Sequence, residues 1–199
     1  MSSRLPQKRA DCYTSHEVSR ICGVAPITVG RWIEAGKLKA FRTVGGHRRI
    51  MKGDLQAFLD DFRIPVSSSP EAMDRRVLVV DDDEVMFKVL REMISLMAGE
   101  WRVEWAANGF EAGRMVETFR PHLVFLDLMM PGLDGFEVCR RIKSDAGTGL
   151  CEIVGITGYF TPENRDKMIE RGAADLLRKP VDFETLQKVL SRVFELDSV

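Results

Sequence analysis

The sequence lacks long hydrophobic runs. Within its 199 residues no stretch approaches the roughly 18 uncharged apolar residues that a membrane-spanning helix needs. The opening residues, MSSRLPQKRADCYTS, also lack the apolar core of a secretory signal peptide. We therefore expect a cytoplasmic protein that does not associate with a membrane.

Cysteine and histidine are scarce. The chain has four cysteines and three histidines, and no two cysteines form a CxxC pair. Zinc sites need clustered Cys and His, and disulfide frameworks need regularly spaced cysteines in a secreted chain. The sequence therefore indicates neither. Its 45% hydrophobic and 30% charged residues are typical of a globular protein instead.

Charge is divided unequally along the chain. The formal net charge is only −1, but residues 1–64 hold 12 Lys and Arg against 6 Asp and Glu, and the remainder holds 17 against 24. A basic segment joined to an acidic one indicates two domains with different partners. Between them the stretch PVSSSPEAMD has the composition of a linker. We therefore expect domains at 1–64 and 75–199, joined by a linker at 65–74.

Apolar runs in the acidic segment predict strands that are buried on both faces. The runs are residues 77–80, 123–126, 153–156 and 176–177, and we expect them to be central strands of a parallel sheet. Apolar and charged residues alternate in WRVEWA, residues 101–106, which is typical of an edge strand. Amphipathic stretches such as VMFKVLREMISLM predict helices between the strands. The expected fold is α/β, a doubly wound sheet of five parallel strands.

Polar side chains follow these strands at the edge where such sheets bind ligands. Asp81 and Asp82 follow the first strand, Asp127 ends the third, Thr157 ends the fourth and Lys179 follows the fifth. Three crowded carboxylates repel one another unless a cation lies between them. Because the ligands are all oxygen atoms, we expect Mg²⁺. With the metal in place, Asp127 can accept a phosphoryl group while Lys179 and Thr157 stabilise its charge.

The acidic segment resembles the receiver domain of two-component response regulators, a flavodoxin-like fold. The motifs that carry the resemblance are VLVVDDDE, VFLDLMMPGLDG, GITG and RKPV, in the order and spacing of that family. The resemblance implies that Asp127 is the phosphoacceptor and that a sensor histidine kinase or a phosphotransfer protein donates the phosphoryl group. It also implies a cis peptide bond before Pro180.

The same resemblance assigns roles to the residues around the phosphoacceptor. It implies that Asp82 is a direct ligand of Mg²⁺, that Asp81 acts largely through water, and that the main-chain carbonyl of Met129 is a further ligand. Thr157 matches the hydroxyl of the family's conformational switch, and Lys179 matches its phosphate-binding lysine.

One departure from the family pattern, and the residues at two positions that tune dephosphorylation, affect the expected behaviour. The family usually has an aromatic switch residue where this chain has Leu176. Met129 and Tyr159 occupy positions that in the family tune the access of water to the acyl phosphate, and two bulky, non-acidic groups there imply slow self-dephosphorylation. We therefore expect a phosphoacceptor rather than an enzyme. A phosphatase of the haloacid dehalogenase class would need an acid where Met129 stands.

The basic segment has the pattern of a helix-turn-helix. Thr14 and Glu17 have capping-box spacing before a short amphipathic stretch that ends at Gly23, and Pro26 opens a second helix, ITVGRWIEAG. A hairpin follows, with its turn at VGG, residues 44–46, and residues 53–62 predict a third helix. We expect a small, mainly helical winged helix-turn-helix domain.

This segment resembles the winged helix-turn-helix domains of the MerR and excisionase group, with TVGGHRRI as the most specific stretch. The resemblance implies that the second helix enters the major groove of double-stranded DNA and that the hairpin contacts the backbone or the minor groove. The expected contacts come from the helix, the hairpin and the loop between them: Thr28, Arg31, Lys37, Lys39, Arg42, His47, Arg48 and Arg49.

Together these patterns predict a response regulator, in which phosphorylation of Asp127 controls DNA binding by the N-terminal domain and so regulates transcription. Phosphorylation can also pair two receivers into a homodimer. Two alternatives remain open. The N-terminal domain can be an adaptor that binds protein, or the chain can bind DNA without phosphorylation, which the departure at Leu176 allows.

Overall fold

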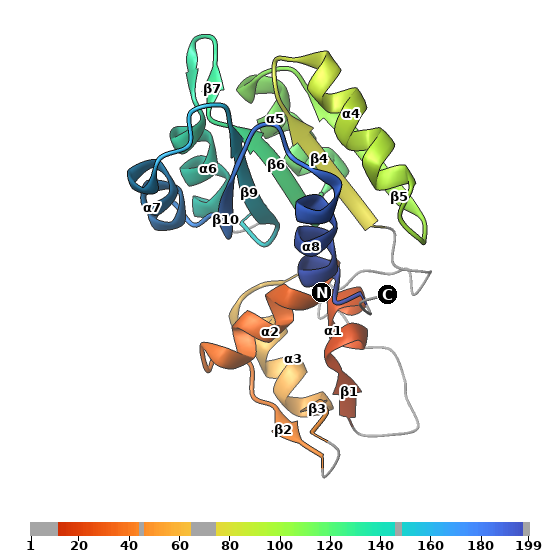
Figure 1. Cartoon of the computed structure of the whole chain (residues 1–199). Helices are drawn as coiled ribbons and strands as arrows, with labels where there is room; N and C mark the ends of the chain where they lie inside the picture. The colour runs from red at the N-terminus through yellow and green to blue at the C-terminus, as the bar shows by residue number, and fades with distance from the viewer. Residues whose placement is uncertain (1–11, 44–45, 65–74, 146–148, 197–199) are drawn as a thin grey trace. The chain divides into compact units, whose positions relative to one another are not determined.

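The protein is described by a computed structural model that covers residues 12–43, 46–64, 75–145 and 149–196. The chain divides into two compact units, Met1–Met73 and Asp74–Val199, which we describe separately (Figure 1). The expected linker at 65–74 lies outside the described residues. In the part of the chain that is described, no helix has the length and apolar character needed to cross a membrane.

The C-terminal unit contains the expected parallel sheet of five strands. They are β4 (Arg75–Val80), β5 (Trp101–Ala106), β6 (Leu123–Asp127), β9 (Glu152–Thr157) and β10 (Asp175–Arg178). All neighbours are parallel, in the order β10-β9-β6-β4-β5. The doubly wound α/β prediction is therefore confirmed.

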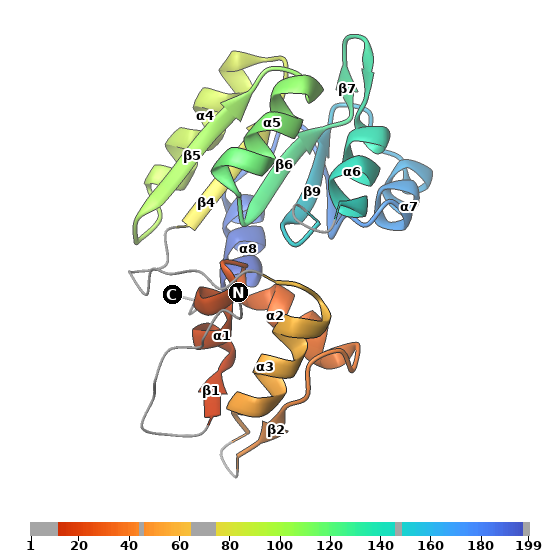
Figure 2. The same ribbon diagram turned by 180° about the vertical axis from the view of Figure 1, so that it is seen from behind.

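Helices cover both faces of this sheet (Figures 1 and 2). On one face lie α4 (Glu84–Ser95) and α8 (Phe183–Phe194). On the other lie α5 (Gly109–Phe119), α6 (Gly135–Ser144) and α7 (Pro162–Glu170), which bury an apolar core against β4, β6 and β9. Because both faces are covered, the central strands can be apolar along their whole length.

The two edges of the sheet differ in how well the sequence predicted them. β5 is an edge strand, as its alternation indicated. The prediction that residues 176–177 lie in a central strand was wrong, because β10 is the opposite edge. Leu176 is nevertheless buried, since it belongs to the same core cluster as Met168 of α7. Burial by a helix therefore produced the pattern of a central strand.

A short hairpin that the sequence did not predict follows β6. It consists of β7 (Met129–Met130) and β8 (Leu133–Asp134), which pair antiparallel, with Gly132 at a φ of +71°. The side chain of Asp134 then caps α6 by accepting from the Phe136 N–H. This hairpin lies beside the carboxyl edge of the sheet (Figure 1).

Within residues 12–43 and 46–64, the N-terminal unit combines three helices with a small antiparallel sheet. Its elements are β1 (Cys12–Thr14), α1 (Ser15–Cys22), α2 (Pro26–Glu34), β2 (Phe41–Arg42), β3 (Arg48–Met51) and α3 (Lys52–Asp61). The expected capping box of Thr14 and Glu17 is present, and Gly23 ends α1 at a φ of +65°. Strand β1 was not predicted, and the hairpin residues 44–45 lie outside the described residues.

Candidate functional site

Three carboxylates meet at the carboxyl edge of the parallel sheet. Asp81 follows β4 directly, Asp82 comes next, and Asp127 ends β6; because β4 and β6 are neighbours, their ends lie side by side. One oxygen atom from each carboxylate lies within 4.8 Å of the others. Asp81 and Asp127 are buried, at 2% and 5% exposure, whereas Asp82 is exposed. Such a cluster of oxygen donors suits a hard divalent cation.

Lys179 connects the two buried carboxylates. Its Nζ atom donates hydrogen bonds to Oδ2 of Asp81 and to Oδ2 of Asp127, each at 2.7 Å. The lysine follows β10, and its main-chain N–H donates to the Thr157 carbonyl at 2.8 Å. The Lys179–Pro180 peptide bond is cis. The strand ends therefore bring residues that are 98 and 52 positions apart into direct contact.

Burial and these ion pairs shift two pKa values in the site. Burial raises the pKa of the Asp81 carboxyl group, and the hydrogen bond from Lys179 only partly offsets that rise. Burial also acts to lower the pKa of Lys179, but the hydrogen bonds to Asp127 and Asp81 outweigh it and the pKa lies above its ordinary value. The Lys179 ammonium therefore stays charged and donates to the Asp81 and Asp127 carboxylates together.

Thr157 and Met129 complete the predicted set of side chains around Asp127. Thr157 ends β9 one residue past Ile156, the residue that pairs with Asp127, and it is fully buried. Its Oγ1 accepts from the Tyr159 N–H at 3.1 Å. The Met129 N–H donates to Asp127 Oδ1 at 3.0 Å, which orients the carboxylate. A metal-binding role for the Met129 carbonyl stays a prediction.

Sequence reasoning missed a tryptophan that contacts the acidic loop. Trp105 Nε1 donates to the main-chain carbonyl of Asp81 at 2.8 Å. The ring of Trp105 stacks on Phe87 of α4, with centroids 5.6 Å apart and planes 11° from parallel. The Asp81 side chain also accepts from the Asp83 N–H at 2.9 Å. Nothing in the sequence indicated this contact, because Trp105 stood out only as one apolar residue in the alternating pattern of an edge strand.

A cleft of about 590 Å³ opens beside the carboxylates. Asp82 lines one side, and the β7–β8 hairpin supplies most of the remaining wall, including Met129 and Pro131. Lys167 also lines it and places its Nζ 3.9 Å from the centre of the Phe136 ring. The exposed carboxylate of Asp82 is therefore reachable from a cleft whose walls are largely apolar.

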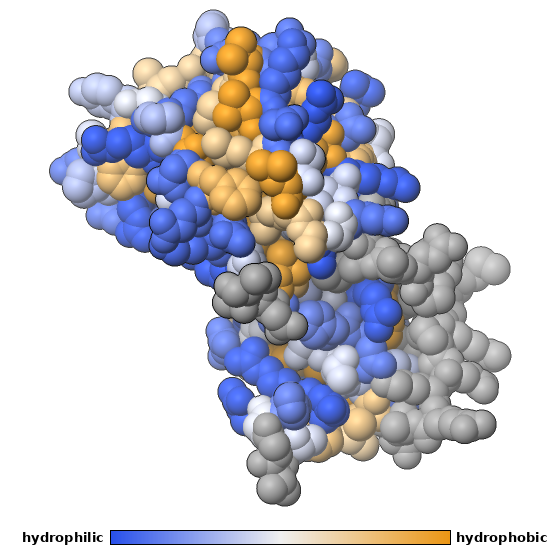
Figure 3. All heavy atoms as spheres, turned by 45° about the vertical axis from the view of Figure 1, so that its right-hand side comes forward, coloured by the Kyte–Doolittle hydropathy of each residue, from blue (hydrophilic) through white to orange (hydrophobic). Residues whose placement is uncertain are grey.

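Exposed apolar side chains surround the site. Each of the five segments that follow a strand of the parallel sheet carries one, either in the connection or in the first turn of the next helix: Val85, Phe110, Met129, Tyr159 and Phe183. Phe110 is 86% exposed and Tyr159 is 68% exposed. Figure 3 shows a stripe of apolar side chains on the face of the C-terminal unit that it draws. Val85 and Val89 of α4 are among the exposed apolar residues. Large apolar groups in such numbers around a charged site indicate a surface that binds a partner.

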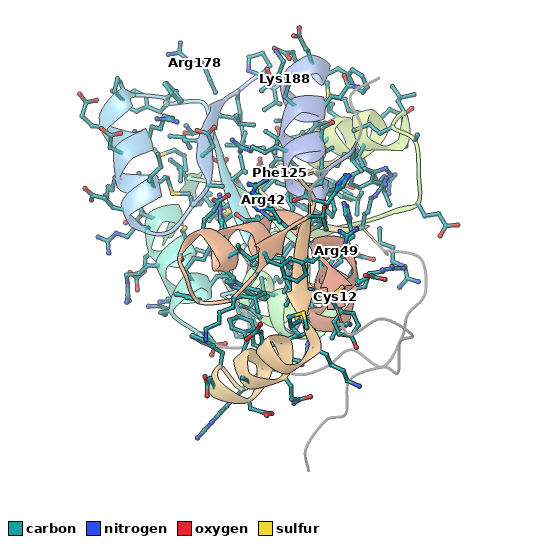
Figure 4. All side chains as sticks on the ribbon, turned by 90° about the horizontal axis from the view of Figure 1, so that it is seen from below. Cys12, Arg42, Arg49, Phe125, Arg178 and Lys188 are labelled. Carbon is teal, nitrogen blue, oxygen red and sulfur yellow. The ribbon has the colours of Figure 1, made fainter. Side chains whose placement is uncertain are left out.

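In the N-terminal unit, most of the predicted DNA contacts are accessible. Exposed residues are Arg31, Lys37, Lys39, Arg42 and His47. Arg48 and Arg49 are half-buried on β3, and Figure 4 labels Arg42 and Arg49 of this sheet. Thr28 differs, because it is 6% exposed within α2. Its contact with DNA stays a prediction.

Comparisons with known proteins match both units. Residues 77–191 match the model of the response regulator receiver domain, and residues 12–63 match that of a helix-turn-helix domain. Response regulator PleD of Caulobacter vibrioides is 40% identical over 110 residues, which are 55% of this chain and 24% of PleD. Response regulator MprA of Mycobacterium ulcerans is 40% identical over 114 residues, 57% of this chain and 47% of MprA. The chain thus matches less than half the length of these relatives.

Solved structures agree with these matches. The signal receiver domain of a DNA-binding response regulator (merR) from Colwellia psychrerythraea has a TM-score of 0.59 and 32% identity, over 62% of this chain and 100% of that one. Chemotaxis protein CheY4 of Vibrio cholerae has a TM-score of 0.55 and 30% identity, over 60% of this chain and 98% of its own. The chain belongs to the response regulator receiver family and carries a helix-turn-helix domain ahead of its receiver domain.

Proposed function

We propose that the chain is a transcription regulator in which Asp127 accepts a phosphoryl group from a histidine kinase or phosphotransfer protein, and that phosphorylation controls binding of double-stranded DNA by the N-terminal unit. One observation carries the proposal: Lys179 bridges the buried carboxylates of Asp81 and Asp127, beside the exposed carboxylate of Asp82. A nucleophile, acidic metal ligands and a cation that stabilises charge are the parts that phosphoryl transfer to a carboxylate requires.

The donor set fits Mg²⁺. Asp81, Asp82 and Asp127 offer oxygen atoms within 4.8 Å of one another, and the Met129 carbonyl would add a further oxygen ligand. A bound Mg²⁺ supplies positive charge that offsets the charge of the phosphoryl oxygens. The exposure of Asp82 leaves space for the water ligands that this ion retains.

The transfer itself uses the side chains of this chain. An Oδ atom of Asp127 attacks phosphorus, the bond between phosphorus and the donor imidazole breaks, and its electron pair stays on the imidazole nitrogen, which takes up a proton from water. The Asp127 carboxylate becomes an acyl phosphate. Lys179 already donates to Asp127, so its ammonium can follow the negative charge onto the phosphoryl oxygens. Thr157 can turn its hydroxyl toward the same oxygens.

The apolar side chains around the site support a protein as the donor. Phe110 and Tyr159 are mostly exposed on two different connections at the carboxyl edge of the sheet. A small phosphodonor needs no such surface, but a protein that buries these groups excludes water from the carboxylates and strengthens the electrostatic contacts. The donor would therefore present its phosphohistidine within an apolar surface.

For the N-terminal unit we propose a groove contact through α2 and backbone contacts through the hairpin. The exposed cations Arg31, Lys37, Lys39 and Arg42 support it, because phosphate contacts by Lys and Arg supply most of the affinity for DNA. The phosphoryl group carries about −1.5 to −2 charges, but the Asp127 carboxylate gives up its own negative charge when the acyl phosphate forms, so the site gains about one negative charge or less, and phosphorylation can pair two receivers. Two linked helix-turn-helix units then bind two half-sites more tightly than one.

The test measures duplex binding by the full chain before and after treatment with acetyl phosphate and Mg²⁺. We expect affinity for a duplex selected from a random pool to change on phosphorylation, and Asp127→Asn to behave like untreated protein. Six phosphate contacts predict a loss of about 1,000-fold in affinity between about 50 and 200 mM salt. A flat salt response with every duplex would contradict DNA binding and favour a protein-binding adaptor. Tight binding that phosphorylation leaves unchanged would favour a phosphorylation-independent regulator.

A further inference from the structure

The neighbouring arginines of the hairpin point to opposite faces of the small sheet. Successive residues of a strand alternate between faces. Arg48 lies on the same face as Arg42, its partner on β2, and as the fully buried Ile50, so it faces the helices. Arg49 pairs with Thr14 and Phe41 and lies on the other face. Arg48 and Arg49 carry the same charge and are adjacent in sequence, but their side chains have different neighbours.

Arg48 lies across the exposed end of α2. Its Nη2 atom makes an ion pair with Glu34 Oε1 at 2.7 Å. Its Nη1 atom lies 3.1 Å from the position that a Cβ atom would take at Gly30. Gly30 and Glu34 are four residues apart and share one side of the helix. Together they form the binding position of the guanidinium group, which we call its seat. The Glu34 carboxylate lies at the Nη2 end, and Gly30, which has no side chain, lies at the Nη1 end.

This seat explains a glycine in the middle of α2. Glycine is the least favourable residue in a helix interior apart from proline, so its presence needs a local reason. Gly30 has an ordinary helical backbone and needs no positive φ. A Cβ atom there would lie 3.1 Å from Nη1, so the guanidinium would have to shift by a few tenths of an ångström. The space left by Gly30 is therefore occupied by the arginine.

We propose that Arg48 is a positioning residue that fixes the hairpin against α2, that Gly30 and Glu34 form its seat, and that this contact sets the sequence selectivity of DNA binding. The inference rests on the proposed DNA binding and replaces the phosphate contact that the sequence predicted for Arg48. The ion pair with Glu34 occupies the Nη2 end of the Arg48 guanidinium, so this end is not available to a phosphate. Arg42 lies directly opposite Arg48, and like charges in such a pair repel, so Glu34 also holds the cation in place.

Gly30→Ala gives the sharpest test, because stability and binding should move in opposite directions. Alanine improves the helix, so we expect an unchanged or higher melting temperature once the mobile end of Arg48 has moved aside. Because the new Cβ atom shifts Arg48 within its seat, we expect the full chain to bind a duplex selected from a random pool about tenfold more weakly, with little change for a random duplex. A role limited to holding the fold together would not lower selectivity in a more stable protein.

Arg48→Gln and Arg49→Gln form a matched pair for the salt dependence. If Arg49 contacts a phosphate, its loss weakens binding to both duplexes and lowers the slope of log affinity against log salt by about 1. Loss of Arg48 should leave that slope unchanged and reduce only the ratio of selected to random binding. Glu34→Gln should also reduce the ratio of selected to random binding. Removal of a negative charge near DNA would by itself strengthen binding, so a lower ratio would come from the loss of the ion pair.

Three results would overturn the inference: a slope lowered by about 1 in Arg48→Gln, tighter selective binding by Glu34→Gln, or an unchanged selectivity ratio in Gly30→Ala. If the wild-type chain binds both duplexes with a steep salt dependence, these results would remove the inference and leave the DNA-binding proposal intact. If the wild-type chain binds neither duplex, both fail together.

Discussion

The indole of Trp105 holds the main chain of Asp81. Its Nε1–H donates to the Asp81 carbonyl oxygen at 2.8 Å, while its ring stacks on Phe87 of α4. The guanidinium carbon of Arg91 lies 5.3 Å from the centre of the Phe87 ring. The edge strand, the acidic loop and the first helix of the receiver are thus joined by one aromatic contact.

We predict that Trp105→Phe weakens Mg²⁺ binding. Phenylalanine keeps a ring on Phe87 but removes the N–H, and a lost hydrogen bond of about 1 kcal/mol corresponds to an affinity about fivefold lower. Titration calorimetry with Mg²⁺ measures the change. Trp101→Phe is the control, because Trp101 packs on Phe194 in α8 and not on the acidic loop. Equal Mg²⁺ affinities in Trp105→Phe and the wild type would refute the role of this hydrogen bond.

The buried carboxylate of Asp81 should destabilise the metal-free chain at neutral pH. Burial raises the pKa of Asp81 above its ordinary 3.8, so the folded state binds this proton more tightly than the unfolded state does. Its contribution to the free energy of unfolding is fully present below the unfolded pKa and is lost as pH rises through the folded pKa. Asp81→Asn should therefore unfold at a higher temperature than the wild type at pH 7.

Thermal melts without metal, at pH 7 and at about pH 4, measure this difference, which should shrink as Asp81 becomes protonated. Asp83→Asn is the control, because Asp83 is exposed and asparagine also caps helices. Added Mg²⁺ should stabilise the wild type and not Asp81→Asn. A wild-type chain that is more stable than Asp81→Asn at pH 7 without metal would contradict the prediction.

Gly155→Ala should destabilise the receiver unit. A Cβ atom there would lie 2.6 Å from Leu176 Cδ1 and 3.0 Å from Met168 Cε, so the core is overpacked at a cost of about 1–3 kcal/mol. Urea unfolding measures the loss. Gly113→Ala is the matched control: no atom lies within 4 Å of its new Cβ in α5, and we expect a gain of up to about 1 kcal/mol. Equal stability of the two variants would be inconsistent with this packing.

Met129 should slow the loss of the phosphoryl group. Its side chain is 65% exposed beside Asp127 and cannot orient a water molecule. Met129→Asn places a polar group there, so we expect self-dephosphorylation to become about tenfold faster. The decay of phosphoprotein on phosphate-affinity gels measures the rate, with Phe110→Asn, a change in a different connection, as the control. A wild-type half-life of only seconds would oppose this account.

The sequence predicted the parts of the receiver that depend on burial and strand polarity. Runs such as residues 123–126 are apolar because helices cover both faces of the sheet, and parallel strands necessarily bring their carboxyl ends to one edge. Asp81, Asp127 and Lys179 could therefore be assigned to one site from the sequence, and the structure brings them into contact.

Contacts between specific side chains could not be predicted in the same way. Neither the hydrogen bond from Trp105 to Asp81 nor the ion pair of Arg48 with Glu34 follows from a periodic pattern, because each depends on where two elements pack. Thr28 was expected at the DNA interface from the family resemblance, and the sequence did not show that this residue is buried within α2. For Leu176, burial beneath a helix imitated the pattern of a central strand.

The central claim is that Asp127 accepts a phosphoryl group at a site that needs a divalent cation. The most direct measurement is the intact mass of the full chain after treatment with acetyl phosphate. We expect the wild type to gain the mass of one phosphoryl group with Mg²⁺ and to gain none when a chelator removes it, whereas Asp127→Asn gains none in either case. An equal gain in Asp127→Asn, or in the wild type without a metal, would contradict the account.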